Sequence, residues 1–507
     1  MSSPCSEPSI TNGSEPSANG AVPSPAKVCE AIPAGAREEL IAAIGARGIL
    51  DRPEDLALYE YDGSVDKVRP AMVVFPRTTE DVVKIVQITG KYNIPIVGRG
   101  SGTGLSGGAI PRSGGVVIGF SRMNKILELD LENERAVLQP GVINLDITLA
   151  VQAMGYFYAP DPSSQRACTI GGNVSENAGG PHTLAYGVTT NHVLGLEFVL
   201  PDGKVYTTGG KEQDLPGLDV TGLLTGSEGT MALVTKIIVR LMRQPEVVKT
   251  LLAIYDSPDH CADTVAEITA RAITPVAVEM LDGEMLAMVE AATHAGYPPD
   301  AAAVLLIELE GLTEGVTEQV EQIKSVCTSC RAREVRVAKD SEERDLLWKG
   351  RKNAFGAVGR VSTSYYVQDG VVPRTQIAPT LRHIAKVGAK HGVRISNIFH
   401  AGDGNMHPII LFDVHKPGDL EKAKAAGEDI LQYCIDVGGS ITGEHGVGME
   451  KNEMMPRLFT PETLETIGRF KRLFDPENRL NPGKVLPTGK GCLEIRQAPL
   501  SAASRVY

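Results

Sequence analysis

The sequence lacks any apolar run long enough to cross a bilayer, which takes about 20 consecutive residues. Positive charge is also in deficit, because 50 Lys and Arg face 62 Asp and Glu and give a formal net charge of −12. This balance disfavours a nucleic-acid partner, and an anionic substrate would need locally arranged positive charge.

The length of 507 residues allows two or three domains with a large core. Peripheral docking to a membrane-bound partner stays open.

Cysteine is scarce and scattered along the chain. The eight cysteines include one Cys-x-x-Cys pair, Cys327 and Cys330. A zinc ribbon or an iron–sulfur cluster needs four ligands, so the pattern predicts neither. Two reduced thiols at the end of a helix are the simpler interpretation.

The amino-terminal region lacks targeting features. Residues 1–30 contain no arginine and are rich in Ser, Pro, Ala, Asn and Gly. They show neither the apolar stretch of a signal peptide nor the basic face of a transit peptide. We therefore expect a disordered tail over residues 1–35 and a cytoplasmic location. A second tail is expected over residues 487–507.

A glycine-rich loop dominates the first half. The strand Ala71–Phe75, the helix Thr79–Gly90 and the strand Ile94–Val97 lead into GRGSGTGLSGG, residues 98–108. Such a loop brings backbone amides close to phosphate, although a lone one can also be a flexible turn. A Rossmann fingerprint would open into a helix, whereas this loop leads into a predicted strand, Val116–Phe120. The pattern therefore excludes Rossmann-type binding.

Further glycine- and serine-bearing loops follow the first. They read APDPSS at residues 159–164, TIGGNVSENAGG at residues 169–180 and LLTGSEG at residues 223–229. Strands separate them. One such loop can hold a pyrophosphate while the others line a flat ring, so together they favour a large polar cofactor.

The second half, residues 247–486, alternates strands and helices. This pattern predicts an α+β layer of ferredoxin-like type. It includes a long helix over Ser341–Val358 and a later helix over Pro461–Phe474. The chain thus divides into a first domain over residues 36–246 and this second domain.

A hairpin signature in the second half carries candidate metal ligands. The runs Arg394–Phe399 and Pro408–Phe412 flank a Gly-Asp-Gly turn, with His400 and His407 at its two ends. The sequence Gly-Glu-His-Gly follows at residues 443–446. Two histidines and a carboxylate suit a divalent transition metal with open positions for substrate. A structural histidine beside an ordinary turn is the alternative.

These motifs carry a resemblance. GRGSGTGLSGGA, APDPSS, TIGGNVSENAGG and GSEG resemble, in that order, the FAD-binding domain of the vanillyl-alcohol oxidase superfamily. HAGDGNMHPIILFD, SITGEHGVGMEK, WKGRKNAFGAVGR and LNPGKV resemble the substrate domain of its 2-hydroxyacid oxidases and dehydrogenases, most closely the flavin subunits of bacterial glycolate oxidases. The resemblance covers residues 40–486. It implies an α+β fold with a two-subdomain FAD-binding domain, a ferredoxin-like α+β substrate domain and a C-terminal helical segment.

The resemblance also implies a set of FAD-binding residues. Some members of the superfamily attach the flavin covalently to a histidine. His182 and His192 lie near the second loop, but nothing in the sequence identifies either as such a site. FAD is therefore expected to bind non-covalently. The expected contacts are Arg99, Gly100, Ser101, Gly102, Thr103, Gly104, Ser106, Pro160, Asp161, Ser163, Gly171, Gly172, Asn173, Ser175, Asn177, Gly179, Glu228, Gly229 and Asn481.

For the chemistry, the resemblance implies metal-assisted oxidation of a 2-hydroxy acid. His400, His407 and Glu444 would hold zinc, manganese or iron, and His445 would take the hydroxyl proton while hydride passes to FAD. Arg351 is the candidate for the substrate carboxylate, because guanidinium binds carboxylate bidentately. Arg351 could instead be an exposed basic residue on a helix that does not bind substrate. His445 could instead be a hydrogen-bond donor that does not itself contact the reacting groups.

Two features that this chain lacks bear on its substrate and its partners. The D-2-hydroxyglutarate relatives place a lysine near the end of the strand Thr363–Asp369, where this chain has Tyr365, Tyr366 and Val367. This favours glycolate, or D-lactate, as substrate. Without its own cluster-binding cysteines, the chain would need separate flavin-binding and iron–sulfur subunits to pass electrons to the quinone pool. A location at the inner membrane through those subunits is compatible with this.

Two other classes of function stay open on the sequence. A metal-dependent hydrolase could use the same histidines and carboxylate, but it would leave the glycine-rich loops without a task. A non-catalytic assembly subunit would bind flavin or metal without turnover. A visible absorption spectrum separates the first of these from a flavoprotein.

Overall fold

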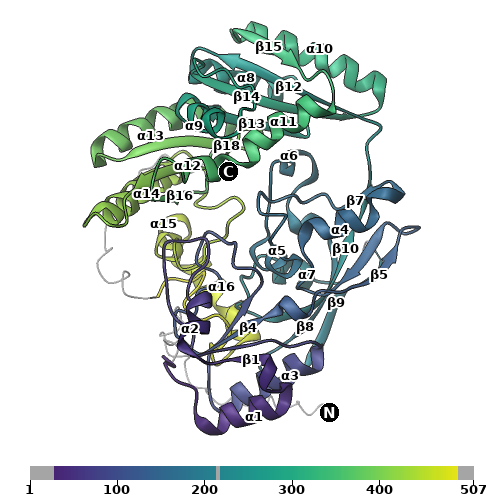
Figure 1. Cartoon of the computed structure of the whole chain (residues 1–507), viewed down its shortest axis with the longest axis vertical. Helices are drawn as coiled ribbons and strands as arrows, with labels where there is room; N and C mark the ends of the chain where they lie inside the picture. Colours follow the sequence, from purple (N-terminus) through teal and green to yellow (C-terminus); the bar gives the residue numbers. More distant parts are fainter. Residues whose placement is uncertain (1–27, 213–216, 489–507) are drawn as a thin grey trace, which may run out of the picture.

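A computed structural model describes residues 28–212 and 217–488, and its two halves lie one above the other (Figure 1). Of the expected tails over residues 1–35 and 487–507, residues 1–27 and 489–507 lie outside the described residues. The lower half, drawn purple and blue, contains the glycine-rich loops. The upper half, drawn teal and green, contains the histidine hairpin.

The first sheet of the lower half has the strand order β1-β2-β4-β3. Three of its strands are parallel, and their apolar runs are buried on both faces. The helices α1 and α3 pack against each other and contribute to the same core. These elements are α1 (Ala34–Ile44), β1 (Ile49–Leu50), β2 (Met72–Val74), α3 (Thr79–Lys91), β3 (Ile96–Arg99) and β4 (Val116–Gly119). The first glycine-rich loop joins β3 to β4, a strand, as the exclusion of a Rossmann fingerprint predicts.

The second sheet of the lower half is antiparallel, with the order β5-β6-β10-β8-β9. Its central strand β10 alternates buried and half-buried residues, which is the period of a strand with one face on a core. The elements are β5 (Ile126–Asp130), β6 (Arg135–Leu138), α4 (Asn144–Val151), α5 (Ile170–Glu176), β8 (Val193–Val199), β9 (Val205–Gly209) and β10 (Leu233–Arg240).

The upper half contains a ferredoxin-like sheet. Its strands run in the spatial order β15-β12-β14-β13, and every neighbouring pair is antiparallel. Numbered along the chain, this order is 4-1-3-2, which confirms the expected fold class. The elements are β12 (Val247–Tyr255), α8 (Pro258–Ala270), β13 (Ala277–Asp282), α9 (Gly283–Thr293), β14 (Ala303–Gly311), α10 (Thr313–Ser329) and β15 (Glu334–Val337).

The histidine hairpin extends this sheet. Strand β18 pairs with β13 on one side and with β20 on the other. Helices α13 and α14 pack against each other beside it. The elements are β16 (Ser364–Val367), β17 (Gly370–Val371), α13 (Ile377–His391), β18 (Arg394–His400), β19 (Asn405–Met406), β20 (Pro408–Phe412) and α14 (Asp419–Asp436).

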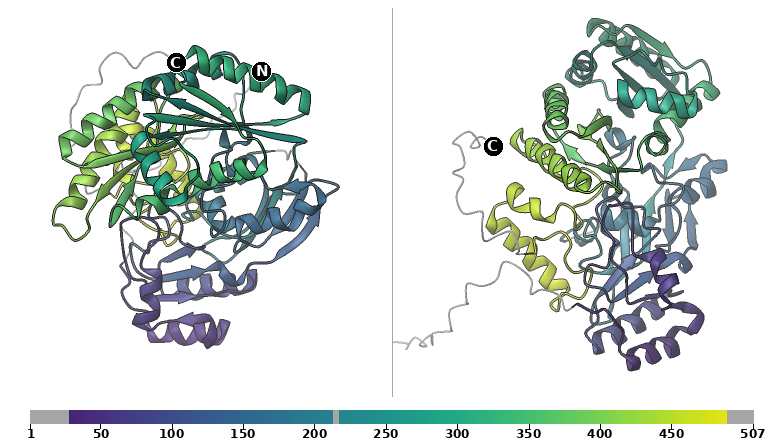
Figure 2. Two further views of the ribbon diagram at one scale, coloured as in Figure 1. Left: turned by 45° about the horizontal axis from the view of Figure 1, so that its top comes forward. Right: turned by 60° about the vertical axis from the view of Figure 1, so that its left-hand side comes forward.

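The chain then returns to the lower half. Helices α15 (Met455–Leu458) and α16 (Pro461–Phe474), drawn yellow, lie beside the purple elements in Figure 1 and in the right-hand view of Figure 2. Beyond α16, Leu480 forms a parallel bridge with Ile96 on β3. The predicted C-terminal helical segment therefore belongs to the lower half in space.

Three local expectations were wrong. The second glycine-rich loop contains helix α5, which Thr169 caps by accepting a hydrogen bond from the Gly172 amide. The single helix expected over Ser341–Val358 is two helices, α11 (Ser341–Lys352) and α12 (Ala354–Val358), separated at Asn353. Residues 28–35 do not form a tail, because Cys29 already pairs with Gly114 and α1 follows it.

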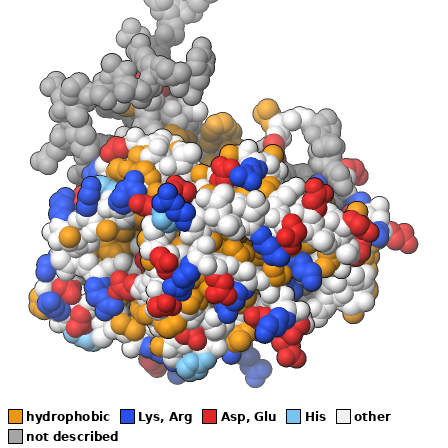
Figure 3. Space-filling view, turned by 90° about the horizontal axis from the view of Figure 1, so that it is seen from above, with side chains coloured by type: hydrophobic (Ala, Val, Ile, Leu, Met, Phe, Trp, Pro, Cys, Tyr) orange, Lys and Arg blue, Asp and Glu red, His pale blue; other side chains and the backbone are white. Residues whose placement is uncertain are grey.

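The surface offers no simple guide to function. Viewed from above, basic and acidic side chains are interspersed, with hydrophobic side chains between them (Figure 3). Within residues 28–212 and 217–488, no helix combines the length and the apolar character that a membrane crossing requires.

Candidate active site

A cavity of about 520 Å³ lies where the two halves meet. One wall is built from the glycine-rich loops of the lower half and the other from side chains of the upper half. The polar or aromatic residues on the upper wall are Arg351, Lys352, Phe355, Tyr365, His400, His407, Glu444 and His445. The histidine hairpin and the glycine-rich loops therefore face one space, although about 170 to 300 residues separate them in the sequence.

The lower wall is formed by closely packed backbone. A Cβ added to Gly100 would lie 2.2 Å from Thr169 Oγ1, and one added to Gly171 would lie 2.6 Å from Pro140 Cβ. Gly102 has a φ of +71°, a conformation that residues with a side chain rarely adopt. Glycine is thus required here for both space and conformation.

Most residues expected to bind FAD line this cavity. Those on the wall are Arg99, Gly100, Ser101, Gly102, Thr103, Gly104, Ser163, Gly171, Gly172, Asn173, Ser175, Gly179, Glu228 and Gly229. The Nη1 atom of the buried Arg99 side chain has no hydrogen-bond partner among the described residues. A guanidinium group readily binds phosphate, so the arrangement fits a cofactor with phosphate groups.

Five expected FAD contacts lie behind the wall instead. Asn481 donates hydrogen bonds to the carbonyls of Gly108 and Glu228 and so joins two of the loops. The Ser106 carbonyl accepts from the Met449 amide. The other three are Pro160, Asp161 and Asn177, which hydrogen-bond to Asn144, His182 and Thr190, respectively. These residues shape the loops rather than facing the cavity.

The two histidines near the second loop also lie off the wall. His182 bridges the halves, because its Nδ1 lies 2.9 Å from Asp161 Oδ2 and its Nε2 lies 3.2 Å from Glu308 Oε1. Burial lowers the pKa of His182, but the two carboxylates outweigh burial and raise it to about 10. His192 Nε2 donates to the Tyr186 carbonyl.

Sequence reasoning missed one acidic residue of the lower wall. Glu176 lines the cavity, and its buried Oε2 has no hydrogen-bond partner among the described residues. Burial, followed by the neighbouring Glu228 carboxylate, raises the pKa of Glu176 well above its ordinary value. Its place within TIGGNVSENAGG was the available signal.

On the upper wall, two histidines converge on one carboxylate. His400 Nε2 lies 3.2 Å from Glu444 Oε1, and His407 Nε2 lies 3.1 Å from the same oxygen. Burial raises the pKa of Glu444, but His400, His407 and His445 together lower it well below the ordinary value. Glu444 is therefore ionised at neutral pH.

The hairpin places these imidazoles through its turn. His400 ends β18 opposite Asn405, and Gly404 adopts a φ of +80° between them. A Cβ on Gly404 would lie 2.1 Å from the Val372 carbonyl oxygen, so the turn packs tightly against the strand end beside it. His400 and His407 thus reach the same side of the sheet, as the sequence predicted.

The remaining ring nitrogens have partners that orient the rings. His407 Nδ1 lies 3.1 Å from the Gln368 carbonyl oxygen, which can only accept, so Nδ1 carries the proton. His400 Nδ1 lies 2.7 Å from Glu279 Oε1. Both Nε2 atoms are therefore directed at Glu444. Burial lowers the pKa of His400, but Glu279 and Glu444 outweigh burial and raise it well above the ordinary value.

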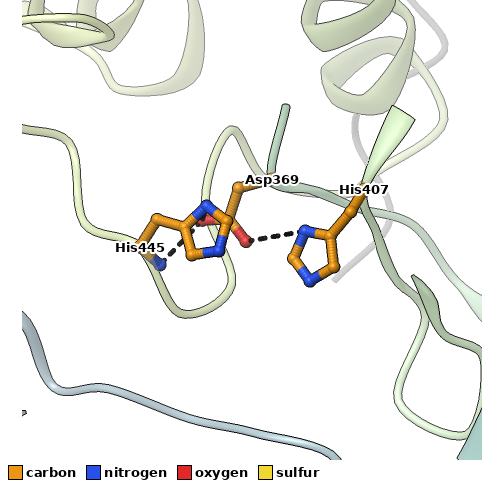
Figure 4. Close-up of side chains that lie close together, drawn as sticks. All are labelled: Asp369, His407 and His445. Carbon is orange, nitrogen blue, oxygen red and sulfur yellow. Dashed lines mark hydrogen bonds and ion pairs between the residues drawn. The ribbon is translucent and has the colours of Figure 1, made fainter. Parts of the chain in front are cut away.

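Asp369 organises the loop that carries Glu444 and His445. Its fully buried carboxylate accepts hydrogen bonds from the amides of Gly443 and His445 and lies 3.4 Å from Lys451 Nζ. Figure 4 shows Asp369 between His407 and His445. The rings of these two histidines stack at 4.8 Å, 11° from parallel. The loop is thus fixed by a residue at the far end of another strand.

Two overlapping groups of side chains have metal-ligand spacing. One is His400, His407 and Glu444, and the other is Asp369, His407 and His445. The first group fits a metal better, because all three residues line the cavity and both Nε2 atoms point at the shared carboxylate. The Asp369 carboxylate is already occupied by amide donors and a lysine.

Arg351 is not an exposed basic residue. It is 2% exposed, and its Nε and Nη2 both lie 2.6 Å from Glu279 Oε2. It nevertheless lines the cavity. The alternative of a solvated helix residue is therefore wrong, while a role toward substrate stays a prediction.

Comparisons with known proteins agree with both walls. Residues 70–209 match the model of an FAD binding domain, and residues 244–485 match the C-terminal domain of FAD linked oxidases. The chain belongs to the FAD-linked oxidases. It is 45% identical to glycolate oxidase subunit GlcD of Escherichia coli over 88% of this chain and 90% of that protein.

Other relatives within the FAD-linked oxidases extend the comparison. Glycolate oxidase subunit GlcD of Bacillus subtilis is 42% identical over 89% of this chain and 96% of its own. A D-lactate dehydrogenase of Archaeoglobus fulgidus is 32% identical over 84% and 95%. The resemblance inferred from the motifs is confirmed, and the chain is an FAD-dependent oxidoreductase.

A solved structure of p-cresol methylhydroxylase shares the fold, with a TM-score of 0.77 at 20% identity over 91% of this chain and 99% of that one. This similarity confirms the vanillyl-alcohol oxidase fold class.

Proposed function

We propose that this protein oxidises a small 2-hydroxy acid, glycolate or D-lactate, to the 2-oxo acid with non-covalently bound FAD and a divalent metal. One observation carries the proposal. The paired imidazoles and carboxylate line the same cavity as the glycine-rich loops, so a substrate held by the former faces a cofactor held by the latter. The names of the relatives, glycolate oxidase subunit and D-lactate dehydrogenase, support the substrate class.

The chain supplies three functions to this reaction. His400, His407 and Glu444 would hold zinc, manganese or iron, which nitrogen and oxygen ligands suit. When bound, the metal would lower the pKa of the substrate hydroxyl and FAD would accept the hydride from the adjacent carbon. His445 takes the hydroxyl proton, because an imidazole nitrogen can accept a proton and this ring lines the cavity beside the proposed metal ligands. Arg351 binds the substrate carboxylate.

The upper wall favours a short substrate. Tyr365 lines the cavity and stacks on Phe355, with ring centroids 5.9 Å apart. No lysine stands at residues 365–367 to meet a second carboxylate. We therefore expect glycolate and D-lactate to be better substrates than 2-hydroxyglutarate.

Electrons leave through partners in this proposal. Cys327 is buried and Cys330 half-buried at the end of α10, and no group of metal-ligand spacing within the described ranges contains a cysteine. Separate flavin-binding and iron–sulfur subunits would therefore carry electrons to the quinone pool. The word subunit in the names of the GlcD relatives supports this. A cytoplasmic location, at the inner membrane through those subunits, stays a prediction.

The test is an assay of D- and L-2-hydroxy acids with an artificial dye acceptor. We expect a yellow protein that reduces the dye with glycolate or D-lactate, loses this activity on chelation while keeping its flavin, and regains it with metal. A colourless hydrolase would contradict the flavin half of the proposal. Full activity after exhaustive chelation would contradict the metal half.

A further inference from the structure

Glu279 is a buried carboxylate that touches two residues of the proposed site at once. It lies on β13 directly opposite His400 on β18 and is 0% exposed. Its Oε1 lies 2.7 Å from His400 Nδ1, and its Oε2 lies 2.6 Å from both Nε and Nη2 of Arg351. One side chain therefore joins the first histidine of the hairpin to the arginine of α11.

We propose that Glu279 is a positioning residue that fixes His400 as a metal ligand and sets its place relative to Arg351. The inference rests on the proposed function, because it concerns the metal proposed there. Glu279 does not line the cavity, so it acts through its two neighbours rather than on substrate. Nothing in its local sequence, AVEMLD, marks it for this role.

Glu279 orients the ring of His400. A carboxylate at Nδ1 keeps the proton on that nitrogen and leaves the Nε2 lone pair directed at the metal position beside Glu444. It also increases the electron density that the ring offers. Changes to such carboxylates typically lower metal affinity about 10- to 100-fold.

Glu279 also sets the spacing of two anchoring points, His400 and Arg351. A 2-hydroxy acid held at the metal and at Arg351 is oriented by the distance between these groups. Glu279 contacts both, and all three side chains are at most 3% exposed. Because buried side chains at this density cannot shift independently, the carboxylate sets that distance. It also neutralises a guanidinium that would otherwise be buried without a partner.

The chain offers a matched control in Glu308. Glu308 lies on the adjacent strand β14 and is 2% exposed. Like Glu279, it contacts α11. Its Oε2 accepts hydrogen bonds from Trp348 Nε1 at 2.6 Å and from Arg344 Nε at 3.1 Å. Among the described residues, it contacts none of His400, His407 and Glu444. Glu308→Gln therefore removes a buried carboxylate of the same sheet and helix, together with its contact to His182, without touching the proposed metal ligands.

The experiment measures zinc affinity on purified, flavin-loaded protein by competition with a chromophoric chelator. We expect Glu279→Gln to weaken zinc binding about 10- to 100-fold and Glu308→Gln to change it less than about twofold. The flavin spectrum and thermal denaturation in excess chelator report folding independently of metal. If Glu279→Gln fails to fold, Glu279→Asp serves instead: it keeps the charge that neutralises Arg351, but is too short to reach both partners, so weakened zinc binding is again expected.

The outcomes separate the inference from the function on which it rests. Folded Glu279 variants that bind zinc as tightly as the wild type would overturn the inference and leave the proposed function standing. Equal weakening by Glu308→Gln would also overturn it, because the effect would then be general to the sheet. A wild-type protein that binds no divalent metal would overturn the metal half of the proposed function together with this inference.

Discussion

The two walls of the cavity are built in opposite ways. The lower wall presents backbone, and its glycines leave no room for a Cβ at Gly100 or Gly171. The upper wall presents ionisable side chains whose partners fix them in place, as Asp369 fixes the loop of His445. The lower wall depends on the absence of side chains at its glycines, and the upper wall depends on the ionisable groups of its side chains.

This difference predicts two patterns of failure. On the lower wall, the smallest added atom should displace the cofactor while leaving the chemistry of the upper wall unchanged. On the upper wall, exchange for a side chain of similar size should stop the chemistry while leaving the flavin bound. The following substitutions test this contrast, from the largest expected effect to the smallest.

The largest effect is expected at His445. His445→Asn keeps a polar side chain of similar reach but removes the proposed proton acceptor, so turnover should fall about 10²- to 10⁴-fold. Steady-state kinetics with glycolate and a dye acceptor measure this. Flavin absorbance and metal content are the controls and should stay at wild-type values. Near-normal turnover in a flavin- and metal-loaded variant would rule out the base role.

A smaller effect is expected where the walls meet, at His182. Its ring bridges Asp161 of the lower half and Glu308 of the upper half, so His182→Gln should cost about 3 kcal/mol of stability. Because the folded-state pKa is raised to about 10 from 6.5, the ion pair stabilises fully below pH 6.5 and is lost as pH rises toward 10.

Thermal denaturation between pH 6 and 10.5 measures this dependence. The wild-type midpoint should fall across the window, and the variant should start lower and fall less. Parallel curves for the two proteins would show that His182 does not titrate in this range.

A third substitution probes the lower wall alone. Gly171→Ala adds a Cβ that would lie 2.6 Å from Pro140 Cβ and 2.8 Å from its carbonyl oxygen, and this backbone cannot move aside freely. Overpacking of this kind costs about 1–3 kcal/mol, so flavin should be retained roughly tenfold less well. Release of flavin on dilution measures it. Zinc affinity should stay unchanged, and its loss would contradict the separation of the two walls.

The smallest effect is expected from the matched control. Gly315 lies in the first turn of α10, as Gly171 lies in the first turn of α5, but a Cβ there meets nothing within 4 Å. Gly315→Ala should therefore stabilise the protein by up to about 1 kcal/mol and leave flavin retention unchanged. Chemical denaturation measures the gain. Loss of flavin would show that the Gly171 effect is not local.

The sequence was informative where a function is carried by contiguous residues. The glycine-rich loops, the ends of the hairpin at His400 and His407, and the Gly-Glu-His-Gly segment were each visible as short patterns. Their meeting in one cavity followed from resemblance rather than from spacing. Helix α16 was predicted with the observed boundaries because its apolar period is strong and Thr460 caps it.

The sequence was silent where a function depends on pairing between distant strands. Glu279 faces His400 only because β13 pairs with β18, 121 residues later. Asp369 reaches the loop of His445 from the end of another strand for the same reason. Hydrophobic periodicity fixes which face of a strand is buried but not which strand lies beside it. Residues such as Glu279 and Asp369 therefore become recognisable only in the folded structure.

The return of the chain to the lower half has a consequence for biosynthesis. Asn481 ties together two loops that flank the flavin wall, so that wall is complete only after residue 481 has left the ribosome. The upper half, in contrast, has all its strands by residue 412. A nascent chain would thus assemble the sheet that carries His400 and His407 before it could retain flavin, and translation halted near residue 450 would yield a protein that is colourless.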